Sequence, residues 1–122
     1  MLTSLLIASF TLLGSAELSP EPLEPVSVAS SLSRLSASEI DTRMQELPDW
    51  TTDGESLFYT RTFEDFVDAI AFVNSLVDPA EQLAHHPDIT INYNRVSLEL
   101  TTHDAQGLTE LDFQLAKTIS QL

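Results

Sequence analysis

Strict alternation of apolar and polar residues over positions 89–101 constrains the fold more than any other feature of this sequence. Such a period of two residues predicts β-strands with one buried face. Asn94-Arg95 interrupts the alternation, and Asn readily adopts the left-handed backbone conformation that tight loops need. We therefore expect a hairpin with Asn94-Arg95 as its loop. The apolar positions on its two strands are Ile89, Ile91, Tyr93, Val96, Leu98 and Leu100.

Three hydroxyl residues are each followed three positions later by a carboxylate, the pattern of a helix capping box. The pairs are Ser36 with Glu39, Thr62 with Asp65, and Thr109 with Asp112. We expect a helix after each, and the first should end near Leu47-Pro48 because Pro disfavours helical geometry before it. The apolar stripes expected on the second and third helices are Phe66, Ile70, Val73 and Val77, and Leu108, Leu111, Leu115, Ile119 and Leu122.

A second pair of short strands is expected within residues 50–60, around the turn Asp53-Gly54. The predicted order is then α-β-β-α-β-β-α, which requires no parallel crossover. We expect an α+β domain in which a four-stranded antiparallel sheet has three helices packed on one face. Because such a sheet has open edges and one uncovered face, self-association is also expected.

The first 35 residues differ in character from the rest. Residues 1–16 contain an apolar run that is too short for a membrane anchor and fits either a secretory signal or an uncleaved cytosolic extension. Residues 17–35 combine three prolines with Glu and Ser, which favours a solvated linker. We place the folded domain in residues 36–122, and its location, exported or cytoplasmic, stays open.

The charge and composition of the chain disfavour several function classes. Asp and Glu total 19 against 5 Lys and Arg, a net charge of -14 that repels nucleic-acid phosphates and anionic membrane surfaces. The absence of cysteine removes thiolate nucleophiles and Cys-based zinc sites. The three glycines stand far apart, so there is no glycine-rich phosphate loop.

All three histidines flank the predicted hairpin. His85 and His86 precede its first strand with Pro87, and His103 follows its second strand. Because a hairpin brings its outer ends together, we expect the three imidazoles to converge, and a pKa near 6.5 suits imidazole to proton transfer. The alternatives are a capped helix end, a surface cluster without a role, and a zinc site, for which adjacent histidines are poorly arranged.

The other candidate residues have a structural interpretation beside the catalytic one. Glu81 lies one helical turn before His85, where it either contacts that imidazole or is a solvated charge. Asp112 is the acid of a capping box, and its charge also lies near His103. Trp50 and Tyr93 either fill part of the core or line a pocket for a flat ring. Thr101, Thr102 and Asp104 surround His103 in the sequence and either support it or only end the strand.

These residues form a spaced set: an acid, His-His-Pro, an aromatic, a histidine and an aspartate. Its members are Glu81, His85-His86-Pro87, Tyr93, His103 and Asp112. At these spacings the set resembles the signature of the pterin-4a-carbinolamine dehydratase family, and the resemblance extends over roughly residues 36–122. It implies the same α+β fold and a homo-oligomer, either a dimer or a tetramer.

The resemblance also implies a reaction, the dehydration of 4a-hydroxytetrahydrobiopterin to quinonoid dihydropterin without metal or cofactor. This step recycles the pterin after aromatic amino-acid hydroxylation, so a hydroxylase would be the pathway partner. By resemblance, His85 and His103 are the acid and base, His86 orients the pterin, and Glu81 holds His85. Some relatives assist transcription factors or the assembly of a carbon-fixing enzyme, so a non-catalytic binding module on the same fold is the alternative.

Overall fold

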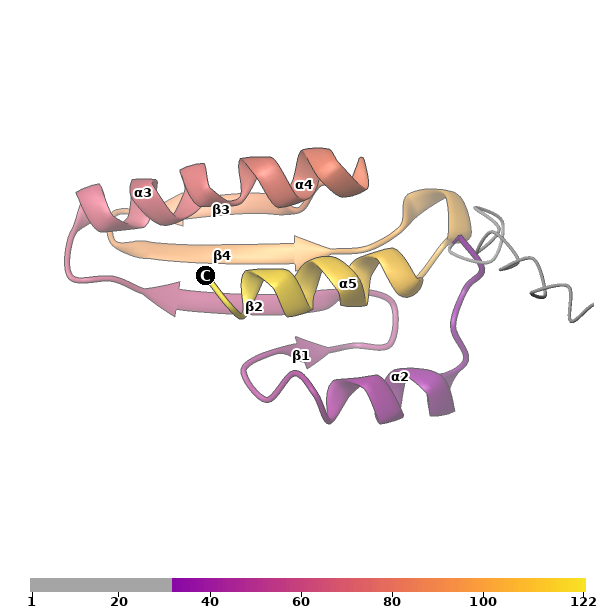
Figure 1. Cartoon of the computed structure of the whole chain (residues 1–122). Coiled ribbons are helices and arrows are strands. Elements are labelled where there is room, and N and C mark those ends of the chain that lie inside the picture. The colour runs from indigo at the N-terminus through magenta and orange to yellow at the C-terminus, as the bar shows by residue number, and fades with distance from the viewer. Residues whose placement is uncertain (1–31) are drawn as a thin grey trace, which may run out of the picture.

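The computed structural model describes residues 32–122, so the predicted segment 1–16 and all but the end of the predicted linker lie outside the described residues (Figure 1). None of the helices in the described part is both long and apolar enough to cross a membrane. The elements in chain order are α2 (Ala37–Met44), β1 (Thr51–Thr52), β2 (Leu57–Thr62), α3 (Phe66–Ser75), α4 (Val77–Leu83), β3 (Asp88–Asn92), β4 (Arg95–Leu100), the 3-10 turn η1 (His103–Ala105) and α5 (Glu110–Ile119).

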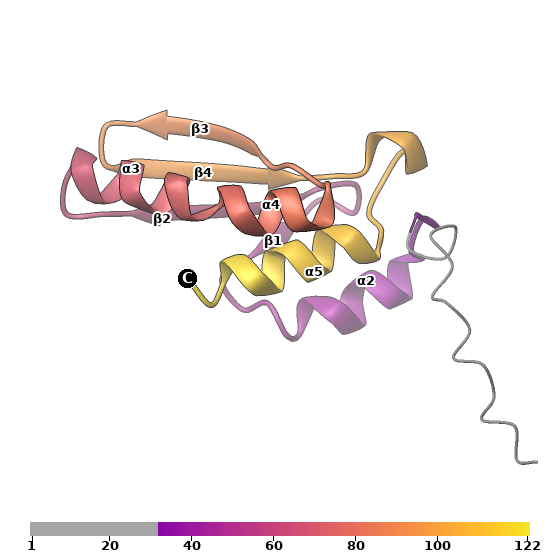
Figure 2. The same ribbon diagram turned by 45° about the horizontal axis from the view of Figure 1, so that its top comes forward.

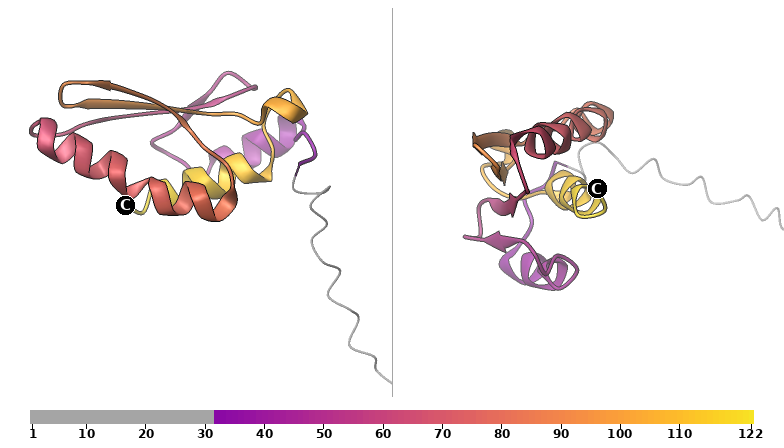
Figure 3. Two further views of the ribbon diagram at one scale, coloured as in Figure 1. Left: turned by 90° about the horizontal axis from the view of Figure 1, so that it is seen from above. Right: turned by 90° about the vertical axis from the view of Figure 1, so that its left-hand side faces the viewer.

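The strands form one four-stranded antiparallel sheet in the order β1-β2-β4-β3. The α-helices of residues 32–122 all lie on the same face of this sheet, as the end-on view in Figure 3 shows. The predicted turn between β1 and β2 is formed by Asp53 and Gly54, whose φ of 94° favours glycine. The predicted α+β architecture is therefore confirmed, with β3 and β1 at the two edges of the sheet.

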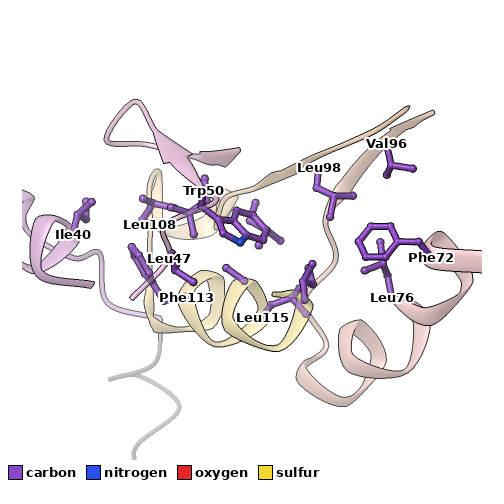
Figure 4. Packing of buried hydrophobic residues seen from close by; sticks show 14 of the residues in the cluster. Ile40, Leu47, Trp50, Phe72, Leu76, Val96, Leu98, Leu108, Phe113 and Leu115 are labelled. Carbon is purple, nitrogen blue, oxygen red and sulfur yellow. The ribbon is translucent and has the colours of Figure 1, made fainter. Parts of the chain in front are cut away.

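The core lies between the helices and the face of β4 that carries Val96, Leu98 and Leu100 (Figure 4). Trp50 belongs to this core, since its indole stacks on Tyr59 with ring centroids 4.9 Å apart. Its Nε1–H donates a hydrogen bond of 2.8 Å to the Ser120 hydroxyl, which satisfies the buried donor. Trp50 thus fills the core instead of lining a pocket.

The second predicted helix is divided into α3 and α4 at Leu76. Pro79 accounts for this break, because in a continuous helix its ring would clash with the Ser75 carbonyl and it has no N–H to donate there. Figure 2 shows the two helices following one another along the sheet.

The expected apolar stripe of this helix is wrong at both ends, although Val73 does pack against the core. The buried residues are Ala69, Phe72, Leu76 and Ala80, whereas Phe66 and Val77 are about half exposed. Both sets have helical spacing, so periodicity alone does not say which one faces the sheet. The small side chains of Ala69 and Ala80 allow α3 and α4 to approach the sheet closely, and this packing selects the buried side.

Two of the three capping boxes form. Ser36 and Glu39 cap α2, and hydrogen bonds from the Ser36 backbone N–H and hydroxyl hold the pKa of Glu39 below its usual value. The box at Thr62 is wrong, because Thr62 continues β2 opposite Arg95. The N-cap of α3 is Asp65, whose carboxylate accepts the Asp68 N–H at 2.9 Å.

The capping box at Ser36 allows a direct stability test. Ser36→Ala is expected to lower the free energy of unfolding by about 1 kcal/mol, the usual cost of losing an N-cap hydroxyl. Urea denaturation followed by circular dichroism measures the change. Asp41→Ala, at an exposed position of the same helix whose side chain makes no hydrogen bond or ion pair within residues 32–122, is the control and should not lower stability. Equal losses in the two variants would contradict the assignment of Ser36 as the cap.

The loop between β3 and β4 consists of Tyr93 and Asn94, one residue earlier than expected. Asn92 pairs with Arg95, and Tyr93 has the left-handed φ of 53° that we expected at Asn94. Asn94 is instead held by Phe63, whose N–H donates to the Asn94 carbonyl and whose carbonyl accepts from the Asn94 amide. Tyr93 therefore lies at the tip of the hairpin, with 64% of its surface exposed.

Candidate active site

The segments that carry the three histidines adjoin the same end of the sheet. His85 and His86 connect α4 to β3, and His103 opens η1 directly after β4 and Thr102. Because Asp88 at the start of β3 pairs with Glu99 near the end of β4, the two connections lie at the same end of the hairpin (Figure 1). The topology thus brings the two histidine-bearing segments to one edge of the domain.

The Asp112 carboxylate joins these segments. Asp112 is fully buried and lies in the first turn of α5. Its Oδ1 lies 2.6 Å from His85 Nε2, and its Oδ2 accepts hydrogen bonds from the Thr102 hydroxyl at 2.7 Å and the Thr109 N–H at 2.9 Å. A buried carboxylate with three donors around it is a rigid acceptor, so it fixes the orientation of the His85 ring.

This contact determines which nitrogen of His85 is free. Against a carboxylate oxygen, Nε2 of the neutral ring carries the hydrogen and Nδ1 keeps the lone pair. Nδ1 has no hydrogen-bond partner in residues 32–122, and no unsatisfied polar side-chain atom there is fully buried, so Nδ1 reaches solvent. His85, with 11% of its side chain exposed, therefore holds an oriented proton acceptor in a largely buried ring.

Glu81 contacts the neighbouring histidine instead of the expected one. Its carboxylate lies 2.6 Å from His86 Nε2, and both side chains are exposed. The expected contact with His85 is wrong because α4 ends at Leu83 and Ala84 turns into the left-handed conformation. The one-turn spacing between Glu81 and His85 therefore no longer places them on one helix face.

Asp112 was expected beside His103, but the histidine that it contacts is His85. Thr102, the residue before His103, is the one that reaches Asp112. Two backbone hydrogen bonds between Thr102 and Gly107 close the loop that carries His103. The side chains of His103 and Asp104 are both exposed on this loop. His103 is thus displayed on a short loop whose base is tied to the buried carboxylate.

An open hollow of about 460 Å³ adjoins His103. Arg34, from the end of the predicted linker, contributes to it and lies so close to Gly107 that a Cβ there would meet Arg34 Nε at 2.8 Å. Leu35 joins the domain through its N–H, which donates to the Leu108 carbonyl. No motif in the sequence marks Arg34, Glu55, Ser56 or Gln106 as neighbours of His103, so their place beside it was not predicted. The lining residues are Arg34, Glu55, Ser56, Thr101, His103, Gln106 and Gly107.

Two candidate residues, Trp50 and Tyr93, lie away from this edge of the domain. Trp50 is enclosed in the core, and Tyr93 lies at the far tip of the hairpin, roughly 20 Å along the strand from His86 at about 3.3 Å per residue. Pro87 is half-buried between His86 and β3. Within residues 32–122, no group of three or more His, Asp or Glu side chains is arranged to hold a metal ion.

The sequence and the fold have close counterparts among known proteins. The family described as "Pterin 4 alpha carbinolamine dehydratase" matches residues 33–122. A Nostoc sp. protein provisionally named pterin-4-alpha-carbinolamine dehydratase is 57% identical over 88 residues, which are 72% of this chain and 95% of that protein. A Thermomicrobium roseum protein of the same provisional name is 47% identical over 91 residues, 75% of this chain and 98% of that protein.

A solved structure also matches. The crystal structure described as a transcriptional coactivator/pterin dehydratase from Brucella melitensis superposes with a TM-score of 0.69 at 35% sequence identity. The match covers 73% of this chain and 97% of that one. The described residues therefore correspond to nearly the whole of that protein.

Proposed function

The chain belongs to the pterin-4-alpha-carbinolamine dehydratase family, and from this premise we propose that it converts 4a-hydroxytetrahydrobiopterin to quinonoid dihydropterin and water. One observation carries the proposal: the buried Asp112 fixes His85 so that Nδ1 faces solvent as a proton acceptor. If Asp112 only capped α5, its carboxylate would not need a histidine beside it. The substrate is an uncharged bicyclic ring system, so the net charge of -14 is no obstacle to its binding.

The bond changes of the reaction call for two proton-transfer groups. As the C4a=N5 double bond forms, N5 loses its proton and C4a loses hydroxide. Hydroxide is a poor leaving group, so one group must accept the N5 proton while another protonates the C4a oxygen, which leaves as water. After turnover the base holds one extra proton and the acid lacks one, and exchange with solvent restores both.

We assign His85 as the base and His103 as the acid. The Asp112 carboxylate accepts a hydrogen bond from the Nε2–H of His85, so Nδ1 is left to take the proton from N5. The same carboxylate stabilises the imidazolium that then forms. His103 lies on the exposed loop beside the hollow of about 460 Å³ and has no carboxylate within ion-pair distance in residues 32–122. It is therefore free to reach the C4a oxygen.

His86 and Glu81 are assigned to substrate binding. Their contact at 2.6 Å orients the exposed His86 ring while leaving its other nitrogen open to the pterin. In the proposed pathway an aromatic amino-acid hydroxylase releases the 4a-hydroxy pterin, and this protein dehydrates it in the next step. The Brucella melitensis protein is described by both a coactivator and a dehydratase role, so protein binding without turnover is the second candidate.

The direct test is an assay with chemically generated 4a-hydroxytetrahydrobiopterin, followed by absorbance of the quinonoid product. We expect the full chain to accelerate dehydration at least about 10²-fold over buffer, the contribution typical of positioned acid and base groups. The doubly substituted His85→Ala/His103→Ala chain is the control and should match buffer. A wild-type rate equal to that of buffer, with a stoichiometric protein partner in a pull-down, would favour the binding role instead.

A further inference from the structure

The hollow beside His103 contains two opposite charges that do not neutralise each other. Arg34 and Glu55 both line this open space of about 460 Å³. No ion pair joins them, and neither the guanidinium of Arg34 nor the carboxylate of Glu55 has a hydrogen-bond or ion-pair partner within residues 32–122. The hollow therefore offers a ligand both a set of N–H donors and a pair of carboxylate acceptors.

Arg34 is held at this hollow by two contacts with the loop that precedes α5. The N–H of Leu35 donates to the Leu108 carbonyl at 2.8 Å, which ties the segment before α2 to that loop (Figure 1). A Cβ at Gly107 would lie 2.8 Å from Arg34 Nε and 3.3 Å from its Cζ. Atoms tolerate no such approach, so the glycine provides the space in which the guanidinium lies against the backbone.

Glu55 is anchored through its backbone while its side chain stays free. It lies in the turn between β1 and β2, where its N–H donates to Asp53 Oδ1 at 2.8 Å. Its carbonyl accepts from the Thr101 hydroxyl, also at 2.8 Å, and Thr101 lies two residues before His103 in the lining of the same hollow. The turn is thus tied to the segment that carries the proposed acid, and the exposed carboxylate is available to a ligand.

One edge of the proposed substrate matches such a pair of charges. The pyrimidinone ring of a pterin carries, in order, the carbonyl oxygen O4, the N3–H and the 2-amino group. The N3–H and one N–H of the 2-amino group point the same way, so together they fit the two oxygens of a carboxylate. O4 is an acceptor, and the N–H groups of a guanidinium donate to it.

We propose that the hollow binds this pyrimidinone edge, with Arg34 donating to O4 and Glu55 accepting from N3–H and the 2-amino group. The assignment rests on the proposed function, and the order of atoms around the ring agrees with it. C4a lies between N5 and C4, so a pterin whose C4a oxygen meets His103 has O4 as its next polar atom along the ring. The hollow that adjoins His103 is the space that receives this part of the substrate.

This arrangement makes Glu55 the residue that selects pterins over related bicyclic rings. A lumazine has a carbonyl oxygen at C2 where the pterin has its amino group, and both rings have O4. In the lumazine the C2 oxygen would face the Glu55 carboxylate, acceptor against acceptor, so one hydrogen bond is lost and a repulsive contact replaces it. Arg34, in contrast, donates to the oxygen that the two rings share and supplies affinity for either.

Calorimetric titration with two stable ligands tests the subsite without turnover. The probes are 6,7-dimethylpterin and 6,7-dimethyllumazine, which differ in the group at C2. The full chain is expected to bind the pterin at least about 10-fold more tightly than the lumazine. Glu55→Gln should remove most of this preference, because the amide can turn its NH₂ toward the C2 oxygen of the lumazine. Glu64→Gln, which removes an exposed carboxylate between β2 and α3, is the matched control and should keep the preference.

Arg34 has a different expected signature. Arg34→Gln should weaken the binding of both probes by a similar factor, about 10-fold, because both carry O4. Gly107→Ala should act in the same direction, since the added Cβ displaces the guanidinium. Arg95→Gln is the matched control: Arg95 is exposed at the start of β4 and makes no ion pair within the described residues, so its replacement removes the same charge without altering the hollow.

The outcomes separate this inference from the proposed function. No binding of either probe, equal affinity of the full chain for both, or an unchanged preference in Glu55→Gln would overturn the assignment of the hollow to the pyrimidinone edge. A chain that shows the Glu55-dependent preference but does not accelerate dehydration loses the proposed function alone. A chain that dehydrates the 4a-hydroxy pterin with a preference independent of Glu55 loses this inference alone.

Discussion

Asp112→Asn is expected to leave the protein folded while lowering kcat by about 10²–10⁴-fold. The amide oxygen can still accept from Thr102 and Thr109, which keeps the buried network largely intact, so the cost in stability should be about 1 kcal/mol. The amide NH₂ would then face His85 Nε2, where the carboxylate now accepts. Nε2 must become the acceptor, so the hydrogen of the neutral ring moves to Nδ1 and the base is lost.

Three measurements separate this tautomer effect from a loss of structure. Steady-state kinetics give kcat and KM, urea denaturation gives the stability, and ¹⁵N NMR of the imidazole identifies the protonated nitrogen. Glu110→Gln is the matched control, because this half-exposed carboxylate on the same helix pairs with Arg43 and should change neither activity nor the His85 tautomer. An Asp112→Asn protein with wild-type kcat would contradict the role of Asp112 in positioning His85.

His103→Ala is expected to lower kcat by about 10²–10⁴-fold because the departing hydroxide would lose its proton donor. The His103 side chain is exposed, so the free energy of unfolding should change by less than about 0.5 kcal/mol. Added imidazole should restore part of the lost rate, because it can supply the missing proton donor. A pH profile of kcat, repeated with added imidazole, measures both the loss and its chemical rescue.

His86→Ala serves as the comparison for this variant. Because His86 contacts Glu81 and is assigned to substrate binding, its replacement should raise KM more than it lowers kcat. Unchanged kcat in His103→Ala, or the same split between KM and kcat in both variants, would contradict the assignment of His103 as the acid.

The parts of the fold that depend on local pattern could be predicted. Alternation identified β3 and β4, and the capping box identified the start of α2. The errors arose where two local patterns compete. Thr62 has the spacing of a capping box, yet its pairing with Arg95 keeps it in β2. Phe66 has the spacing of a buried helical stripe, yet it faces solvent while Phe72 packs on the sheet. The break between α3 and α4 could have been predicted from Pro79, because a proline inside a helix interrupts it.

The candidate site divides in the same way. The positions of His85, His86 and His103 around the hairpin follow from sequence order, because a hairpin returns the chain to its starting end. The partner of each imidazole does not follow from it. Spacing paired Glu81 with His85, but the left-handed Ala84 at the end of α4 turned His86 toward Glu81 instead.

By itself, the sequence determined the order of strands and helices, the α+β class and the placement of the histidine-bearing segments at one end of the hairpin, because these follow from periodicity and chain reversal over a few residues. Only the tertiary structure decided that Asp112 contacts His85, 27 residues away, and that Tyr93 lies far from the histidines of its own chain. Such contacts depend on how each helix rotates about its axis and on how the sheet ends. Packing across the whole core fixes both, and no local pattern records them.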